Sequence, residues 1–195
     1  MSDDIRLNKL VDFVKEIQKL KLVQRRIILS DKKTMESSAE HSWEIATYLI
    51  LFRKELPEGL DNERALKISL AHVLVEIYAG DVLAFDKKKR IGKEKREEEA
   101  AIKLFSKLPK DLEEEFMGLH EEYCKGETKE SKVVKSFDKI QPIIQNIEAG
   151  GQAWKDNNVK RAEIDEYKRK YMLHDKNILD IYEKVLQEAS DKCMI

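Results

Sequence analysis

The 195-residue chain has few residues that make turns or cross-links: seven glycines, three prolines and two cysteines. No segment alternates apolar and polar residues over the length of a strand, so sheets joined by tight turns are not expected. Cys124 and Cys193 lie far apart and form no Cys-x-x-Cys motif. This spacing favours reduced thiols without a chemical role over a disulfide framework or a thiolate metal site.

The chain also lacks long apolar runs and a strong net charge. No run approaches the about 18 apolar residues that a membrane span needs, and the start, MSDDIRLNKL, resembles neither a signal peptide nor a lipidation motif. We therefore expect a cytoplasmic protein. With a formal net charge of -1, no field of the whole molecule attracts nucleic acid or an anionic membrane, so any phosphate needs a local site.

What the chain does contain is helical periodicity, at a length that predicts one domain over residues 1–195. An apolar stripe marks the first helix: Leu7, Leu10, Val11, Val14 and Ile17. The segment 22–35 is irregular and reads as a partly buried connection, in which Arg25 and Arg26 could face a pocket.

Two core helices are predicted next. Ser37 and Glu40 fit a capping box that begins a helix just before His41, and this helix should continue to Pro57. Asp61 or Asn62 can cap a second helix, which is apolar over most of its circumference through Ile77 and should stop at Gly80.

The charged segment 86–99 reads as a solvated loop that enters a helix. Four further helices are predicted: Glu94–Lys107, Pro109–Cys124, Lys129–Ala149 and Arg161–Ala189. The sequence thus predicts an all-α helical bundle.

Three residues near the second core helix could carry chemistry. A single histidine on an apolar helix is most often a core residue, but His72 and Glu76 are spaced i and i+4, and Asp81 follows the glycine stop. With His41 from the preceding helix, they make a site of imidazoles and carboxylates. Such sites suit divalent Mn, Co, Fe, Ni or Zn, and these ions lower the pKa of bound water.

Asp138 lies among apolar residues of a late helix, where a carboxylate needs a partner. A salt bridge or a helix cap is the simpler role, and metal binding is the alternative. His120 and His174 have no partners at ligand spacing, and the basic run Lys87–Arg90 lacks interleaved aromatic residues and reads as a solvated face.

Two segments, residues 36–43 (ESSAEHSW) and 71–81 (AHVLVEIYAGD), resemble the signature segments of the HD-domain superfamily of metal-dependent phosphohydrolases. The 5'-deoxynucleotidase branch is the most similar, with further matches at Arg96-Glu97, Glu121-Glu122-Tyr123 and Phe137-Asp138-Lys139-Ile140. The likeness covers about residues 20–147. It implies a single HD-type helical domain, onto which helices at about 161–190 pack.

The resemblance also implies a site and an activity. The family's metal ligands match His41, His72 and Asp138, its catalytic carboxylates match Glu76 and Asp81, and its phosphate-binding arginine falls at Arg26, or at Arg25 as the alternative. The implied reaction is hydrolysis of nucleoside 5'-monophosphates, preferably deoxy forms, by a homodimer that uses a divalent metal ion.

One position departs from the family pattern. The fourth metal ligand, the Asp of an adjacent His-Asp pair, is replaced by Val73, which cannot coordinate a metal ion. Three ligands with water at the open positions can still form a 2-His-1-carboxylate site. The sequence therefore leaves two readings: a metal-dependent phosphomonoesterase, or an inactive HD-fold protein that binds nucleotides or acts as a scaffold.

Overall fold

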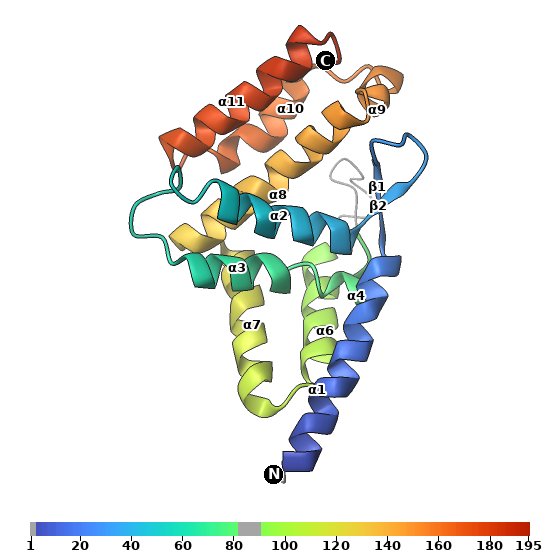
Figure 1. Cartoon of the computed structure of the whole chain (residues 1–195), viewed down its shortest axis with the longest axis vertical. Helices are drawn as coiled ribbons and strands as arrows, with labels where there is room; N and C mark the ends of the chain where they lie inside the picture. The colour runs from blue at the N-terminus through green and yellow to red at the C-terminus, as the bar shows by residue number, and fades with distance from the viewer. Residues whose placement is uncertain (1–2, 82–90) are drawn as a thin grey trace.

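Helices dominate the computed structural model, which describes residues 3–81 and 91–195. The predicted all-α class is confirmed, with one small sheet added (Figure 1). In chain order the elements are α1 (Asp3–Ile17), η1 (Gln18–Leu22), β1 (Gln24–Ile28), β2 (Met35–Ser37), α2 (Ser38–Leu51), α3 (Asn62–Ala71), α4 (Glu76–Ala79), α6 (Lys93–Phe105), α7 (Lys110–Lys125), α8 (Lys129–Glu148), α9 (Gln152–Asp156), α10 (Arg161–Lys168), η2 (Arg169–Tyr171) and α11 (Lys176–Asp191).

The small sheet corrects the expected irregular connection. β1 and β2 pair antiparallel, with Gln24 opposite Ser37 and Ile28 opposite Met35. The turn between them is closed by the Asp31 side chain, which accepts from the backbone N–H groups of Lys33 and Thr34 at 2.9 Å each. Strands of five and three residues are too short for a visible alternation, so only the Asp-containing turn signalled this hairpin.

The start of α2 is confirmed and its end is not. Ser37 and Glu40 form the predicted capping box, and α2 begins at Ser38. The helix ends at Leu51, six residues before Pro57, and Glu55 N–H bonds to Phe52 O in a tighter turn. The polar residues 53–55 have no core face to bury, whereas Phe52 stacks on Phe137 at 5.7 Å between ring centroids.

The second core helix is divided, which corrects the prediction that His72 and Glu76 share a helical face. Asp61 caps α3 as expected, but α3 ends at Ala71. Residues 72–75 form a turn with i to i+3 hydrogen bonds such as Glu76 N–H to Val73 O, and α4 follows, ending at Gly80 with a φ of 72°. A segment that is apolar on all sides carries no periodicity that would reveal this break.

In the second half of the chain, α6, α7 and α8 lie within a few residues of the predicted helices. Residues 86–90 of the charged segment 86–99, and with them the basic run Lys87–Arg90, lie outside the described residues. The predicted helix Arg161–Ala189 is instead α10, η2 and α11, because Asp175 begins a new helix by accepting from the Ile178 N–H at 3.0 Å.

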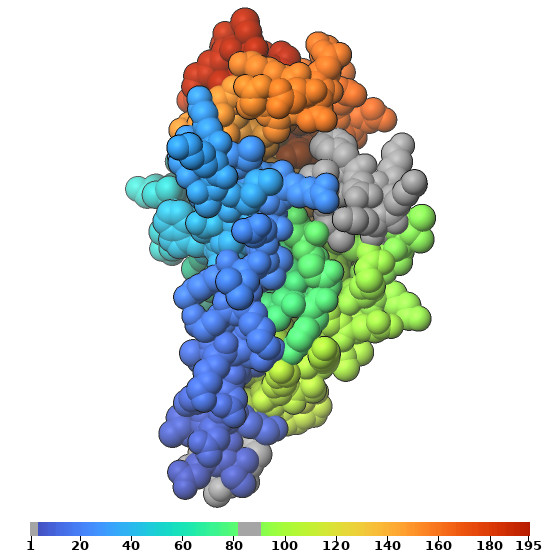
Figure 2. Space-filling view, turned by 90° about the vertical axis from the view of Figure 1, so that its right-hand side faces the viewer, coloured from blue at the N-terminus to red at the C-terminus, as the bar shows by residue number. Residues whose placement is uncertain are grey.

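Two apolar clusters surround the site. One joins α2, α3, α8 and α11, with α8 running through the middle of the molecule (Figure 1). The other joins α1, α6 and the turn 72–75. On the surface, α4 lies between the N-terminal segment and α6 (Figure 2).

The expected apolar stripe of α1 is only partly buried. Phe13 is in the core, whereas Leu7, Val11 and Val14 are exposed. Within the described residues, no helix combines the length and apolar character that crossing a bilayer requires.

Candidate metal centre and its cavity

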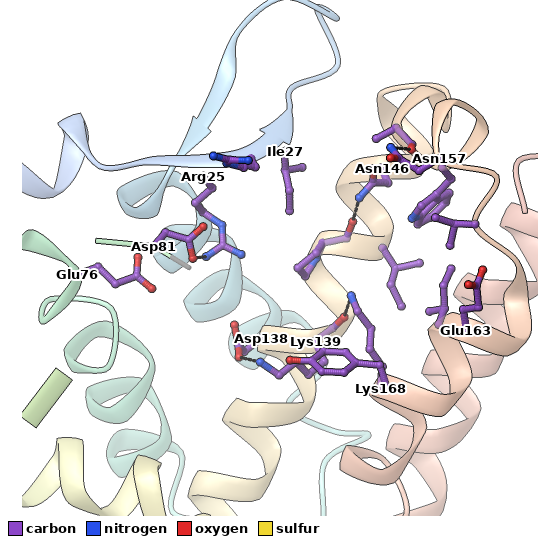
Figure 3. Close-up of a pocket in the computed structure, with 18 of the residues that line it drawn as sticks. Arg25, Ile27, Glu76, Asp81, Asp138, Lys139, Asn146, Asn157, Glu163 and Lys168 are labelled. Atoms are coloured by element: carbon purple, nitrogen blue, oxygen red, sulfur yellow. Dashed lines mark hydrogen bonds and ion pairs between the residues drawn. The ribbon is translucent and has the colours of Figure 1, made fainter. Parts of the chain in front are cut away.

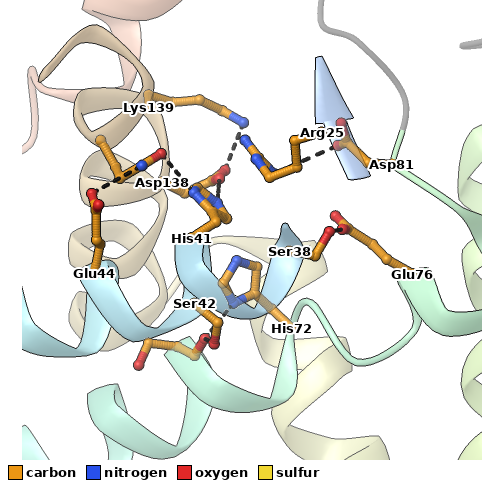
Figure 4. Close-up of polar contacts among 12 residues, drawn as sticks. Arg25, Ser38, His41, Ser42, Glu44, His72, Glu76, Asp81, Asp138 and Lys139 are labelled. Carbon is orange, nitrogen blue, oxygen red and sulfur yellow. Dashed lines mark hydrogen bonds and ion pairs between the residues drawn. The ribbon is translucent and has the colours of Figure 1, made fainter. Parts of the chain in front are cut away.

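His41, His72 and Asp138 meet at the centre of the molecule from α2, the end of α3 and α8. One ligand atom of each lies within 4.8 Å of those of the others, and all three residues are buried (Figure 4). His72 is the first residue of the turn 72–75, directly after α3, and its imidazole lies next to side chains of α2 and α8. The sequence-predicted ligands are therefore brought together.

His41 is oriented by a glutamine one turn beyond Asp138. Its Nδ1 lies 2.7 Å from Oε1 of Gln141, whose Nε2 donates to Glu44 at 2.9 Å and to Glu36. Because the amide nitrogen faces two carboxylates, its oxygen must accept, and Nδ1 of His41 carries the hydrogen. Nε2 then directs a lone pair at Oδ1 of Asp138, 3.0 Å away. Two facing acceptors require a proton or a cation between them.

His72 has an unused acceptor. Its Nδ1 donates to the carbonyl oxygen of Ser69 at 2.8 Å, while Nε2 is buried and has no hydrogen-bond partner among residues 3–81 and 91–195. Burial lowers the pKa of His72 to about 4, despite the opposing effect of Asp138, so the ring is neutral at pH 7. A buried lone pair without a partner is unfavourable unless a ligand uses it. The donor set thus fits a divalent metal ion.

In the part of the chain that the structure describes, His120 also has a buried nitrogen without a partner, Nδ1, but no group of metal-binding side chains surrounds it. Its Nε2 lies 3.6 Å from Sγ of Cys124. The metal-like grouping found among the described residues does not include it.

Asp138 is held from two more sides. The hydroxyl of Tyr123 donates to Oδ2 at 2.8 Å, and Nζ of Lys139 lies 2.7 Å from the same oxygen. Burial alone would raise the pKa of Asp138, but Lys139 and His41 hold it well below the usual range. The carboxylate is therefore ionised and able to bind a cation. The salt bridge that was the simpler prediction is confirmed, and the metal role of Asp138 stays a prediction.

The two predicted catalytic carboxylates lie beside this group, on α4 and just after it. The hydroxyl of Ser38 donates to Glu76 at 2.5 Å, and burial, reinforced by Asp81, raises the pKa of Glu76 (Figure 4). Oδ1 of Asp81 lies 3.6 Å from a guanidinium nitrogen of Arg25. Two carboxylates and one arginine thus face the same space.

Of the two candidate arginines, Arg25 faces inward. Its Nε donates to Glu36 at 2.8 Å, and only 10% of its side chain is exposed, whereas Arg26 is exposed on the other face of β1. Both still line the cavity. The geometry thus favours Arg25 over Arg26, the reverse of the order expected from the sequence.

A cavity of about 420 Å³ joins the metal-like group to the C-terminal helices (Figure 3). Its inner end is bounded by Arg25, His72, Glu76, Asp81 and Asp138. Its outer end is bounded by side chains of α8, α9 and α10 and of the segments beside them: Asn146, Trp154, Asn157 and Tyr167. Lys168 of α10 also lines the cavity, beside Lys139 and Asp138 (Figure 3). The volume is typical of small-molecule sites, about 300–1,000 Å³.

The model of the HD domain family matches residues 17–178. The chain belongs to the HD domain family. It is 31% identical over 140 residues to 5'-deoxynucleotidase HDDC2 of Bos taurus, covering 71% of this chain and 67% of that protein. The Homo sapiens protein of the same name is 29% identical with the same coverage.

Two solved structures have a fold similar to that of this chain. A predicted metal-dependent phosphohydrolase from Magnetospirillum magnetotacticum MS-1 superposes with a TM-score of 0.88 at 34% identity, covering 97% of this chain and 95% of that chain. A conserved hypothetical protein from Pyrococcus furiosus superposes with a TM-score of 0.65 at 29% identity, covering 91% of this chain and 99% of that one.

In this HD-domain chain, Val73 takes no part in the polar group. It is 1% exposed and belongs to the apolar cluster of α1 and α6. The position therefore offers methyl groups where the family pattern has a carboxylate. The remaining donors are His41, His72 and Asp138.

Sequence reasoning missed three supporting residues of the HD-domain site: Glu36, Gln141 and Lys168. Glu36 is fully buried and holds both Arg25 and Gln141. Lys168 lines the cavity from a helix outside the signature segments. Glu36 lies next to the capping box, where an acid preceding a helix is unremarkable, so no local signal identified it.

Proposed function

We propose that this protein is a metal-dependent phosphomonoesterase that hydrolyses nucleoside 5'-monophosphates, preferably deoxyribonucleotides. The observation that carries the proposal is the grouping of His41, His72 and Asp138. His72, whose Nε2 has no partner among the described residues, and Asp138 line one cavity with an arginine and two carboxylates. The names of the relatives, 5'-deoxynucleotidase and predicted metal-dependent phosphohydrolase, support the same reaction.

His41, His72 and Asp138 would hold the metal ion, and this borderline-hard donor set suits Mn, Co, Fe, Ni or Zn. A divalent ion supplies Lewis-acid chemistry there, polarising a phosphoryl oxygen and lowering the pKa of water. Gln141 fixes the tautomer of His41 and leaves Nε2 free for coordination.

Arg25 would bind the phosphate oxygens. Its guanidinium is already anchored by Glu36 at Nε, and Asp81 limits its movement from the other side. An anchored planar guanidinium presents its remaining N–H groups to an oxyanion with little loss of side-chain entropy. Arg26, at the exposed rim, would add charge where the substrate enters.

Glu76 would accept a proton from the attacking water and return it to the leaving group. Its raised pKa brings a carboxylate closer to neutral pH, where it can accept a proton from the attacking water. As the water oxygen bonds to phosphorus, the bond to the 5' oxygen breaks, and Glu76 returns the same proton to that leaving oxygen. If Asp81 accepts the proton in place of Glu76, Asp81 returns it in the same way. The products are a nucleoside and inorganic phosphate.

The outer end of the cavity would take the nucleoside. Trp154 and Tyr167 offer aromatic surface, and Asn146 and Asn157 offer amide groups. These residue types suit a base, which needs both a flat apolar contact and hydrogen-bond partners. Inorganic phosphate alone would leave this end unused.

Nucleotide binding without hydrolysis is the second candidate function. Val73 favours it, because the site has one anionic ligand fewer than the family pattern and a correspondingly weaker hold on a cation. The arginine, the carboxylates and the outer cavity would be retained for binding.

The deciding experiment measures phosphate release from the four deoxynucleoside and four ribonucleoside 5'-monophosphates with Co, Mn, Zn, Fe or Ni added in turn. Metal-dependent release that His72→Ala abolishes and His120→Ala leaves intact supports the hydrolase. His120 is the matched control because it is also buried with a partnerless nitrogen but lies outside the group. Tight nucleotide binding without release under every metal would favour the second candidate.

We also propose a cytoplasmic homodimer. The exposed apolar face of α1, formed by Leu7, Val11 and Val14, supports an assembly because its side chains are about half exposed in the single chain (45–59%). Light scattering on the purified protein tests it: the mass should be twice 22.8 kDa and should fall toward that value in Val11→Asp.

A further inference from the structure

Lys168 is a buried amine that the chemistry described above does not use. It ends α10 and is 9% exposed. Its ammonium donates to the carbonyl oxygen of Lys139 at 2.9 Å, and no carboxylate of the described residues lies within ion-pair distance of it. Because burying a charge without a counter-charge is unfavourable, this position favours a function over a packing role.

The surroundings of Lys168 add further positive charge. Burial, together with Lys139 and Arg25, lowers the pKa of Lys168 to about 7, against the opposing effect of Asp138. Lys139 is paired with Asp138, and Arg25 with Glu36 and Asp81. Lys168 is thus the cation of this trio that has no carboxylate partner in the part of the chain the structure describes.

Lys168 lines the same cavity as Arg25 and Asp138. Figure 3 shows its side chain at the cavity wall beside Lys139, reaching in from α10, whereas Arg25 reaches in from β1. An anion between these two elements would receive charge from both and would supply the missing counter-charge. The phosphate dianion of a nucleotide is such an anion.

We propose that Lys168 binds the phosphate group of the substrate, so that a C-terminal helix outside the signature segments completes the phosphate site. This inference rests on the proposed function for the identity of the ligand. A lysine here acts as a compact point charge, and Arg25 supplies the directional hydrogen bonds.

The inference predicts opposite effects of one substitution on stability and on binding. Lys168→Met keeps an unbranched side chain of similar reach and removes the charge, so the ligand-free protein should melt at the same temperature or higher. A lysine with a merely structural role, tying α10 to α8 through Lys139, would instead melt lower when replaced. The melting temperature therefore separates the two roles.

The test compares inorganic phosphate, dAMP and deoxyadenosine by calorimetry at fixed pH and ionic strength. Lys168→Met should weaken phosphate and dAMP binding at least tenfold and change deoxyadenosine binding less than twofold, and Lys168→Arg should recover part of the loss. The matched control is Lys170→Met, which removes the same charge from an exposed position two residues away.

Three results would overturn the inference: no phosphate binding by the unaltered protein, equal phosphate affinity with and without the Lys168 ammonium, or equal losses for dAMP and deoxyadenosine. A turnover assay on the same samples keeps the two proposals apart. Lys168-dependent phosphate binding without turnover refutes only the hydrolase, whereas turnover with an unchanged KM in Lys168→Met refutes only the role of Lys168.

Discussion

Gln141 lies one turn after Asp138 on α8 and contacts His41 across the site, with Oε1 of the amide 2.7 Å from Nδ1 of the imidazole. The same amide is fixed by Glu44 and Glu36 through its nitrogen. A metal ligand and its orienting partner are thus supplied by two helices that pack directly against each other. Mutation of such an orienting partner typically lowers metal affinity or activity 10- to 100-fold.

We therefore expect Gln141→Met to weaken metal binding by about tenfold or more, because Nδ1 of His41 loses its acceptor and the ring is no longer held in one tautomer. Titration with Co or Mn, followed by calorimetry, measures this. Gln145→Met is the control, since Gln145 is also buried on α8 but donates to the carbonyl oxygen of Ile28. Equal metal affinity in Gln141→Met and the unaltered protein would contradict the orienting role.

A carboxylate at position 73 should lower the stability of the metal-free protein and raise its affinity for a metal ion. Val73 is buried in an apolar cluster, so Val73→Asp should lower the metal-free stability by about 1–3 kcal/mol and raise the affinity for Co or Mn. Added metal should then raise the melting temperature of Val73→Asp more than that of the unaltered protein, because binding to the folded state stabilises it.

Val75→Asp is the matched control for this change. Val75 is 1% exposed in the same cluster, but it is three residues from His72, whereas Val73 is next to it. Val75→Asp should therefore lower the stability without rescue by metal. Rescue of both variants, or of neither, would show that position 73 does not face the metal.

The parts of the fold that local chemistry decides were predictable from the sequence. Ser37 and Glu40 satisfy each other's backbone groups within one turn, and Asp61 accepts from Arg64 three residues on, so both helix starts could be read directly. The turn at 72–75 could not, because Val73 and its neighbours are apolar on every side and give no period. Its position depends on packing against α1 and α6.

In the candidate site, too, some residues could be predicted from the sequence and others depend on packing. His41, His72 and Asp138 could be proposed because their residue types and the resemblance identify them, and the structure groups them. Gln141 and Lys168 could not, since their contacts depend on how α8 and α10 pack across the cavity. The choice between Arg25 and Arg26 depended on the alternation of a short strand, which the sequence did not show.

The tie between α1 and α4 should be sensitive to acid. Lys19, Tyr78 and Lys107 hold the pKa of Glu16 at about 2, and the Tyr78 hydroxyl donates to it at 2.5 Å. A carboxyl whose folded pKa is lowered stabilises the fold above its unfolded pKa of about 4.5, and this contribution is lost as the pH falls toward 2.

Glu16→Gln should therefore lower the free energy of unfolding by about 1 kcal/mol at pH 7, and the difference from the unaltered protein should shrink between pH 5 and pH 2. Urea unfolding followed by circular dichroism at pH 7, 5 and 3 measures it. Asp12→Asn on the same helix is the control, because Asp12 is 73% exposed and pairs only with its neighbour Lys15 within the described residues. A difference that does not depend on pH would contradict the assignment to ionised Glu16.

Glu76→Gln separates proton transfer from metal binding. The amide keeps the size of the side chain but cannot accept a proton, so kcat should fall about 10²- to 10⁴-fold while metal affinity stays within about twofold. Glu97→Gln is the control, since Glu97 lines the same cavity but pairs with Lys93 at 3.0 Å. Because burial raises the pKa of Glu76, the acid limb of kcat should lie above the ordinary glutamate pKa of about 4.5. A full loss of metal binding in Glu76→Gln would show that this carboxylate binds the metal instead. An unchanged kcat would assign the proton transfer to Asp81.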